Sequence, residues 1–229
     1  RLSKDTLRRV NSELLNQFAA RGCAITEGVA VDARLVQSAS RPISTGKLTE
    51  ERDKRKTRKG QLDRKGNTLT FSRDIESDWT AEKGKPHFGL KGHAAVDTRY
   101  GFLLATEITP ASHHDSPHLP LCIAGSCHTR EPIQKVYADK GYFGEPNQAF
   151  CAINGIADGI MRKATKGADL TAFEVARNKA IAKIRYVVEQ YFGLIHLCNN
   201  ASGARFTTIV KNATDALFRQ FAFNLRRGT

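Results

Sequence analysis

The chain has 229 residues, of which 40% are hydrophobic, so it is long enough to bury one sizeable core. Its 36 Lys and Arg against 23 Asp and Glu leave a formal net charge of +13, which favours a polyanion partner, with nucleic acid first and a membrane surface second. No stretch approaches ~20 apolar residues and the N-terminus is charged and polar, so we expect neither a membrane span nor a signal peptide.

The first predicted element is an amphipathic helix over residues 3–21. Its apolar side chains recur at helical spacing: Leu7, Val10, Leu14 and Phe18. Gly22 can end this helix. A β-branched run over residues 29–31 predicts the first strand, which we expect to end at Asp32. We therefore treat residues 1–24 as a short N-terminal helical segment and residues 25–229 as the main domain.

Residues 37–86 are predicted to form a basic insertion in that domain. The segment is dense in charge and poor in large apolar groups, and for its first half we favour a solvated or mobile loop. Such a loop can still become ordered along DNA phosphates. The candidate phosphate contacts lie within residues 47–65: Lys54, Arg55, Lys56, Arg58 and Lys59. Trp79 could stack on a base, but we favour a role in anchoring the loop to the core.

The second half of the chain predicts three more strands and several helices. Alternation over residues 88–97 predicts a half-buried strand whose polar face carries Lys91 and His93. A turn at 97–101 leads into a strand over 102–109, and a short helix follows Ser116. The run KVYAD predicts a strand that ends at Asp139, and helices are expected over about 170–195 and 207–226. This order predicts an α/β fold with a ribonuclease-H-like, mixed five-stranded sheet flanked by helices.

The acidic residues after the predicted strands have two interpretations. Asp139 can begin a turn, or it can be one of the working groups that α/β folds place at strand ends. If the strands before Asp32 and Asp139 are neighbours, the two carboxylates could share a Mg²⁺ pair for in-line phosphoryl displacement. Glu189 is the candidate third acid, with Arg185 and His196 on the same helix face. The alternative is an ordinary surface Arg–Glu pair.

Five blocks of sequence together resemble the DDE transposases of bacterial insertion sequences. In chain order they are VDARLV, KPHFGLKGHAAVD, YGFLLATEITPASHHDS, VYADKGYFG and IRYVVEQYFGLIH. They are similar to the insertion-sequence-five branch of the insertion-sequence-four-like superfamily, over almost the whole chain. The resemblance implies that Asp32, Asp139 and Glu189 form the catalytic triad. It also implies cleavage at transposon ends and strand transfer into target DNA, with Mg²⁺ as cofactor, Mn²⁺ as a substitute and a homodimer on DNA.

Two residues near the predicted triad depart from the pattern of the family. Ala182 stands where the family usually has Tyr, and His196 stands where it has a Lys that meets DNA. A neutral His would hold phosphate less well than Lys. The triad is therefore intact while its DNA-contacting neighbours differ, which leaves a catalytically weak or inactive DNA-binding derivative, or a plain ribonuclease-H-like nuclease, as alternatives.

The remaining candidates surround the segment HHDSPH. Its side chains could ligate zinc, but we favour Asp115 and Ser116 as caps of the following helix. A similar His-Asp pair in the family implies that His114 and Asp115 lie near the active edge, as supporting residues. Lys91, His93 and Lys140 could contact a phosphate, together with Arg185 and His196. The five cysteines, an odd number without a Cys-x-x-Cys pair, are typical of a reduced cytoplasmic protein.

Overall fold

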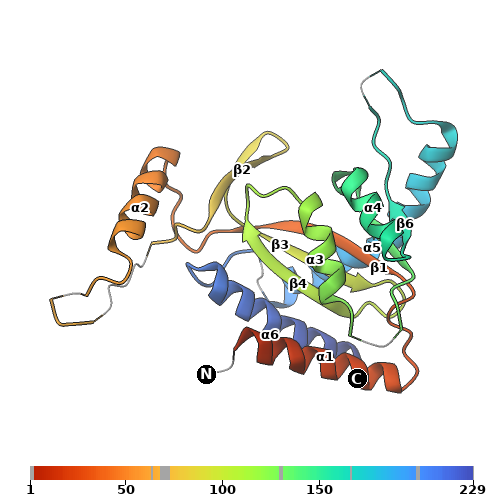
Figure 1. Ribbon diagram of the computed structural model, residues 1–229, viewed down its shortest axis with the longest axis horizontal. Coiled ribbons are helices and arrows are strands. Elements are labelled where there is room, and N and C mark those ends of the chain that lie inside the picture. Colours follow the sequence, from red (N-terminus) through yellow and green to blue (C-terminus); the bar gives the residue numbers. More distant parts are fainter. Residues whose placement is uncertain are drawn as a thin grey trace.

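The computed structural model describes residues 3–62, 64–67, 73–128, 131–165, 167–199 and 202–228. These ranges form a mixed β-sheet with helices on both faces (Figure 1). The strands are β1 (Val29–Gln37), β2 (Asp78–Glu82), β3 (Lys85–Asp97), β4 (Leu103–Pro110), β5 (Lys135–Ala138) and β6 (Ala157–Ile160). The α-helices are α1 (Lys4–Ala20), α2 (Thr45–Arg58), α3 (Leu119–Gly125), α4 (Glu145–Ile153), α5 (Ala172–Asn199) and α6 (Ile209–Gly228), with 3₁₀ turns η1 (Ser116–His118) and η2 (Lys140–Tyr142). No helix in these ranges is long and apolar enough to cross a membrane.

Strand order confirms the predicted ribonuclease-H-like sheet. The central strand β1 pairs antiparallel with β3 and parallel with β5. On one side β4 continues antiparallel to β3, and on the other side β6 continues parallel to β5. The short strand β2 extends this five-stranded core to six. Because Gly89 pairs with both Gln37 and Asp78, β2 lies on the edge of β3 that faces away from β1.

Alternation along β1 divides the core into two layers. Val29 and Val31 belong to the layer formed with α1, α3 and α4. Ala30 belongs to the other layer, where Val188 and Tyr191 of α5 pack against the sheet. Successive side chains of a strand point to opposite faces, so the even-numbered residues of β1 all point toward α5.

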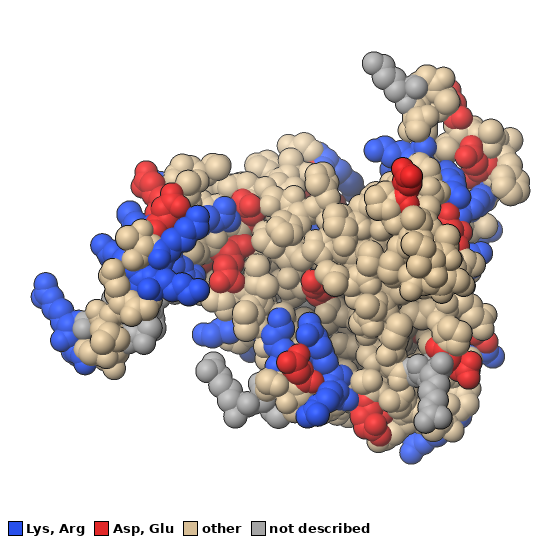
Figure 2. Space-filling view, in the orientation of Figure 1, with Lys and Arg blue, Asp and Glu red and all other residues tan. Residues whose placement is uncertain are grey.

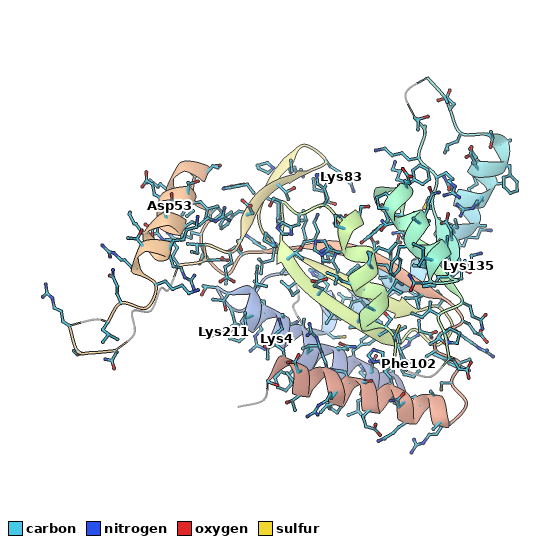
Figure 3. The ribbon with its side chains drawn as sticks, in the orientation of Figure 1. Lys4, Asp53, Lys83, Phe102, Lys135 and Lys211 are labelled. Carbon is cyan, nitrogen blue, oxygen red and sulfur yellow. The ribbon has the colours of Figure 1, made fainter. Side chains whose placement is uncertain are left out.

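Helix α1 packs on α6 and on one end of the sheet. Leu15 is fully buried, and the ring of Phe18 stacks on that of Phe102 with centroids 4.8 Å apart. Figure 3 labels Phe102 near these two helices. Asn11 Nδ2 donates to the carbonyl oxygen of Leu217 at 3.1 Å. The helix predicted over 3–21 is thus confirmed, and Ser3 caps it by accepting from the backbone N–H of Thr6. Its division from the rest of the chain as a separate segment stays a prediction.

The predicted loop in the first half of residues 37–86 is wrong, because this part contains helix α2. Most of its residues are Lys, Arg, Glu and Thr, and the long charged side chains are good helix formers. Only Leu48 is buried, so the segment lacks the apolar stripe by which a helix is usually recognised. The rest of the basic insertion includes residues 63 and 68–72, which lie outside the described residues.

The anchor of this insertion is Trp79, as we favoured from the sequence. Its Nε1 donates to the carbonyl oxygen of Ile43 at 2.7 Å, and its ring packs against Phe88. Arg52 of α2 donates to the carbonyl oxygens of Ile75 and Ser77 at 2.9 and 3.0 Å. These contacts attach the base of α2 to the start of β2, while the helix itself extends away from the sheet (Figure 1).

Candidate active site

Asp32 and Asp139 occupy adjacent positions on neighbouring parallel strands. Val31 of β1 pairs with Ala138 of β5, and each aspartate is the next residue along its strand direction. Val31 and Ala138 both point into the layer formed with α1, α3 and α4. The aspartates that follow them therefore lie on the opposite face of the sheet, which α5 covers. Asp139 follows the end of β5, as predicted. Asp32 does not end β1, because the antiparallel partner β3 continues pairing with β1 as far as Gln37; that prediction is corrected.

The Asp32 carboxylate is poorly solvated and has two hydrogen-bond donors. Arg185 Nη2 lies 2.7 Å from Asp32 Oδ2, and the backbone N–H of Ala33 donates to Oδ1 at 2.9 Å. Burial raises the pKa of Asp32 to about 6, and the negative charges of Asp139 and Asp115 contribute to the increase. Arg185 and the Ala33 N–H act in the opposite direction. The positive charge of Arg185 does not fully offset the cost of burying this carboxylate. Such a carboxylate suits a site that binds further positive charge.

Asp139 is held by the turn that follows it. Its Oδ1 accepts from the backbone N–H of Gly141 at 2.7 Å. A Cβ at Gly141 would lie 2.9 Å from the same oxygen, so glycine keeps this carboxylate free of a close side chain. Within the described ranges, Asp139 Oδ2 has no hydrogen-bond donor. This explains the break in the chain directly after β5: the turn fixes one oxygen and leaves the other available.

Helix α5 brings Arg185 to Asp32 and places Glu189 one turn farther along. Arg185 is buried, whereas Glu189 is exposed. Glu189 lies about 40° around the helix from Arg185, at the border of the face that packs on the sheet. It is not among the charges that act on the pKa of Asp32. Two of the three predicted acids therefore lie side by side, and the third lies at the edge of the helix that covers them.

His196 lies farther along the same border of α5 and contacts β1. Arg34 Nη2 lies 3.1 Å from His196 Nδ1, and Arg34 Nη1 donates to the carbonyl oxygen of Phe192 at 3.0 Å. Since a guanidinium only donates, Nδ1 accepts and the ring proton lies on Nε2. His196 is exposed, so this N–H can still meet an anion, as predicted for a phosphate contact. Arg34 comes two residues after Asp32 and shares its sheet face.

The carboxylate pair fits a divalent cation. Both side chains offer hard oxygen atoms on one face, and Mg²⁺ prefers one or two carboxylates with room for other oxygens. Asp139 Oδ2 is available, while Arg185 supplies the positive charge at Asp32. In the part of the chain that the structure describes, no three His, Cys, Asp or Glu side chains gather as a metal-binding cluster. The site is thus a pair of carboxylates, to which Glu189 remains a predicted addition.

His93, predicted to contact a DNA phosphate, instead makes its contacts inside the protein. His93 is fully buried, its Nε2 lies 3.0 Å from Thr109 Oγ1, and its ring packs 4.5 Å from that of His118. Burial lowers the pKa of His93 to about 3, with the charges of His118, Lys91 and His113 adding to the effect. The predicted phosphate contact of His93 is therefore wrong. The polar face of β3 is covered by η1 and α3 rather than by solvent.

Lys91 and Asp115 form an ion pair near the two aspartates. Lys91 Nζ lies 2.8 Å from Asp115 Oδ1 and also donates to the carbonyl oxygen of His113 at 2.6 Å. The side chain of Asp115 makes no capping hydrogen bond to η1, so the favoured role as a cap is wrong for this carboxylate. Asp115 instead lies close enough to act on the pKa of Asp32, and His114 beside it is exposed.

The predicted basic contacts gather on α2. Figure 2 shows Lys and Arg side chains concentrated over this helix at the left of the molecule. Lys54 and Lys56 make only exposed pairs with acidic residues three positions earlier, and Arg55 lies 4.0 Å from Glu76. Arg58, Lys59 and, next to the site, Lys140 are exposed. The side chains on and directly after α2 form an accessible cationic surface away from the carboxylate pair, whereas Lys140 lies beside that pair.

Comparison with known proteins identifies the family. Residues 25–225 match the family model described as a transposase DDE domain. The chain belongs to this family of DDE transposases. It is also 31% identical over 224 residues to the transposase for insertion sequence element IS1106 of Neisseria meningitidis serogroup B, covering 96% of this chain and 72% of that protein. The predicted transposase resemblance is confirmed.

Two solved structures are weakly similar to this DDE transposase chain. One is the Mos1 strand transfer complex, at 9% identity and a TM-score of 0.30. The other is a pre-cleavage Mos1 transpososome, at 10% identity and the same TM-score. The alignments cover all of this chain but only 63% and 64% of the Mos1 chains. A TM-score of 0.30 does not bear on the fold, which rests on the strand order above.

Two residues of this transposase-family site were missed in the sequence. Arg34 holds both α5 and His196, and its position two residues after Asp32 on one strand face was the available signal. Tyr142 is fully buried, and its pKa is raised by burial and by Asp115, Asp32 and Asp139. The sequence shows it only as part of the turn after β5.

Proposed function

We propose that this chain is the transposase of a bacterial insertion sequence, acting in the cytoplasm on the DNA of the nucleoid. It cleaves DNA at the ends of its element and joins the freed end to target DNA. The observation that carries the proposal is the adjacency of Asp32 and Asp139 on one sheet face, beneath a helix that supplies Arg185 and Glu189. Membership of the DDE transposase family supports the same chemistry. We keep the insertion-sequence-five branch as part of this proposal.

The reaction is a displacement at phosphorus. In cleavage, a water oxygen forms a bond to phosphorus as the bridging 3′-oxygen leaves. In joining, a 3′-hydroxyl oxygen of the element forms the bond to a target phosphorus, and the 3′-oxygen of the target strand leaves. In both steps the attacking oxygen loses a proton and the leaving 3′-oxygen gains one. Asp32, Asp139 and Glu189 would hold Mg²⁺, or Mn²⁺ in its place. The bound cation would stabilise the attacking oxygen and the oxygen that leaves the phosphodiester. Gly141 and Ala33 orient the two aspartates through their backbone N–H groups.

DNA would be held by hydrogen-bond donors on both sides of the carboxylates. Lys140 follows Asp139 directly, and the exposed His196 lies at the end of α5. The basic residues of α2 would bind phosphates farther from the reacting bond: Lys54, Arg55, Lys56, Arg58 and Lys59. Phosphate contacts of this kind position a protein on DNA without reading its sequence. Since two element ends must meet for transposition, we propose that a homodimer assembles on DNA.

The test compares Asp139→Asn with the matched control Asp5→Asn, which alters an exposed aspartate of α1. Each protein is incubated with Mg²⁺ or Mn²⁺ and a plasmid carrying the element ends, and cut and joined products are quantified. Asp139→Asn keeps the side-chain shape but removes a metal ligand, so activity should fall by more than about 100-fold, beyond the usual effect of an outer-shell change. The control should match the wild type.

Three results would contradict the proposal. Equal activity of the wild type and Asp139→Asn would exclude the carboxylate pair as the catalytic centre. Tight DNA binding without cleavage under either metal would instead identify a non-catalytic DNA-binding protein. Cleavage without joined product would identify a plain nuclease.

A further inference from the structure

The guanidinium of Arg185 is buried with one strong acceptor. Only 8% of the residue is exposed. Its Nη2 donates to Asp32 Oδ2 at 2.7 Å, and Nη1 reaches only the sulfur of Met161, at 3.9 Å. Across the described ranges, the buried Nε atom has no hydrogen-bond acceptor. Burying a donor without an acceptor is unfavourable, so this side chain is poised to accept a further anionic partner.

The same contact occupies the oxygen of Asp32 that a cation needs. Asp32 Oδ1 accepts from the Ala33 N–H, which leaves Oδ2 for both Arg185 and any metal ion. An arginine guanidinium is a fixed positive charge. A divalent cation at Oδ2 would therefore lie within a few ångströms of a fixed positive charge, in surroundings that screen poorly. The two cations compete for one carboxylate.

The backbone of α5 is held on both sides of Arg185. Toward its start, Arg177 donates to the carbonyl oxygens of Ile160 and Asp158, both at 2.7 Å. Toward its end, Arg34 donates to the carbonyl oxygen of Phe192. The helix is thus fixed to the sheet at two points, so a movement of Arg185 away from Asp32 would have to come from its side chain and not from the helix.

We propose that Arg185 is a charge latch. In the free protein it pairs with Asp32 and weakens the binding of divalent cations there. When a cation occupies Asp32 and Asp139, the guanidinium turns to a DNA phosphate, which also supplies an acceptor for its unpaired Nε. This inference rests on the proposed function, because it takes the two aspartates as metal ligands. Its consequence is that the complete metal site forms readily only when DNA is present.

The test measures Mn²⁺ binding to the DNA-free protein by electron paramagnetic resonance. Arg185→Gln removes the competing charge, so its dissociation constant for Mn²⁺ should fall by about tenfold or more, the size of a typical coupling between sites. Arg185→Lys keeps the charge and should stay near the wild-type value. Arg205→Gln is the matched control, since it removes a different Arg–Asp pair, at 3.2 Å from Asp215. Unchanged or weaker Mn²⁺ binding by Arg185→Gln would overturn the latch.

Asp139→Ala separates failure of the latch from failure of the proposed function. If it leaves Mn²⁺ binding unchanged, the metal site itself is wrong. If it abolishes binding while Arg185→Gln does not tighten it, only the latch is wrong.

A second measurement covers the case in which Arg185→Gln does not fold. Mg²⁺ is titrated into the ¹⁵N-labelled wild type, and the side-chain Nε–H resonance of Arg185 is followed, assigned by its loss in Arg185→Lys. The latch requires this resonance to move as Mg²⁺ binds. A resonance that stays fixed while the protein saturates with Mg²⁺ would contradict it.

Discussion

Burial shifts the pKa values of Asp32 in β1 and His93 in β3 more than any single neighbouring charge does. Desolvation is the largest cause of the raised pKa of Asp32 and of the lowered pKa of His93. The two aspartates, by contrast, owe their proximity to strand register and not to attraction, since their charges repel. The scaffold therefore supplies a geometry that the side chains alone would resist, and a divalent cation bound between the two aspartates would relieve this repulsion.

The buried His93 predicts a specific loss of stability in acid. Its pKa of about 3 lies below the ordinary histidine value of 6.5, so the unfolded chain binds a proton that the folded protein excludes. Its contribution is complete above about pH 6.5 and is lost as the pH falls toward 3, with a slope of up to about 1.4 kcal/mol per pH unit. Urea denaturation of the wild type and His93→Gln between pH 7 and pH 4 measures this slope.

The comparison with His93→Gln also removes the effect of other titrating groups. The raised pKa of Asp32 has the opposite sign, because a group protonated more readily in the folded state adds stability as the pH falls. Asp32 is present in both proteins, so its effect cancels. Because only the wild type loses the contribution of His93 in acid, the difference in free energy of unfolding between the two proteins should grow smaller toward acid pH. Parallel pH profiles would show that His93 becomes protonated without unfolding.

Helix α2 is the element that carries exposed positive charge away from the sheet. It is attached to the body by Leu48, by the two backbone contacts of Arg52, by the ion pairs Arg52–Asp78 and Arg55–Glu76, and by the neighbouring Trp79 anchor. The remaining length of the helix is solvated on most sides, where good helix formers and pairs such as Lys54–Glu51 support it. A solvated helix of this composition suits binding to a polyanion.

Neutralising α2 should weaken DNA binding and its dependence on salt. The variant changes four exposed residues to Gln: Lys54, Lys56, Arg58 and Lys59. If all four meet phosphates, the slope of log K against log salt should become shallower by about 3 to 4. The control changes four exposed residues outside α2 to Gln: Arg8, Arg9, Arg21 and Lys211. Fluorescence anisotropy at several salt concentrations gives both slopes. An equal change of slope in the two variants would show that net charge, and not the position of α2, determines the effect.

The elements that the sequence could predict are those with local signals. β5 and Asp139 follow from a short apolar run and a glycine turn, and α5 follows from its apolar spacing. The end of β1 could not be predicted, because it depends on how far the distant β3 continues pairing. Alternation along β3 correctly grouped Lys91 with His93, but it could not show that η1 and α3 cover that face. α2 has too little apolar spacing to predict a helix.

At the scale of the whole molecule, the two ends of the chain support each other. α1 and α6 lie side by side along one edge of the sheet (Figure 1). Asn11 of α1 donates to α6, and Gln220 and Asn224 of α6 donate to the carbonyl oxygen of Leu103 in β4. The first helix thus contributes to the stability of the sheet that holds the candidate active site.

Truncation of Leu15 should destabilise the whole domain. Its side chain is fully buried between α1 and the sheet, so Leu15→Ala should lower the free energy of unfolding by about 2–5 kcal/mol. The exposed Leu197→Ala, at 81% exposure, should have little effect. Chemical denaturation monitored by Trp79 fluorescence compares the two variants. A change under about 0.5 kcal/mol for Leu15→Ala, the size of an ordinary surface substitution, would show that α1 is dispensable to the fold.

The length of α2 has a consequence for the stretch of duplex that the protein covers. Fourteen residues of helix extend about 21 Å, which equals the rise of about six base pairs. Laid along the backbone, this arm would shield roughly half a helical turn beyond the bond being cut. Hydroxyl-radical footprinting would reveal that extra protected interval, and shortening the arm would shrink it from its outer end.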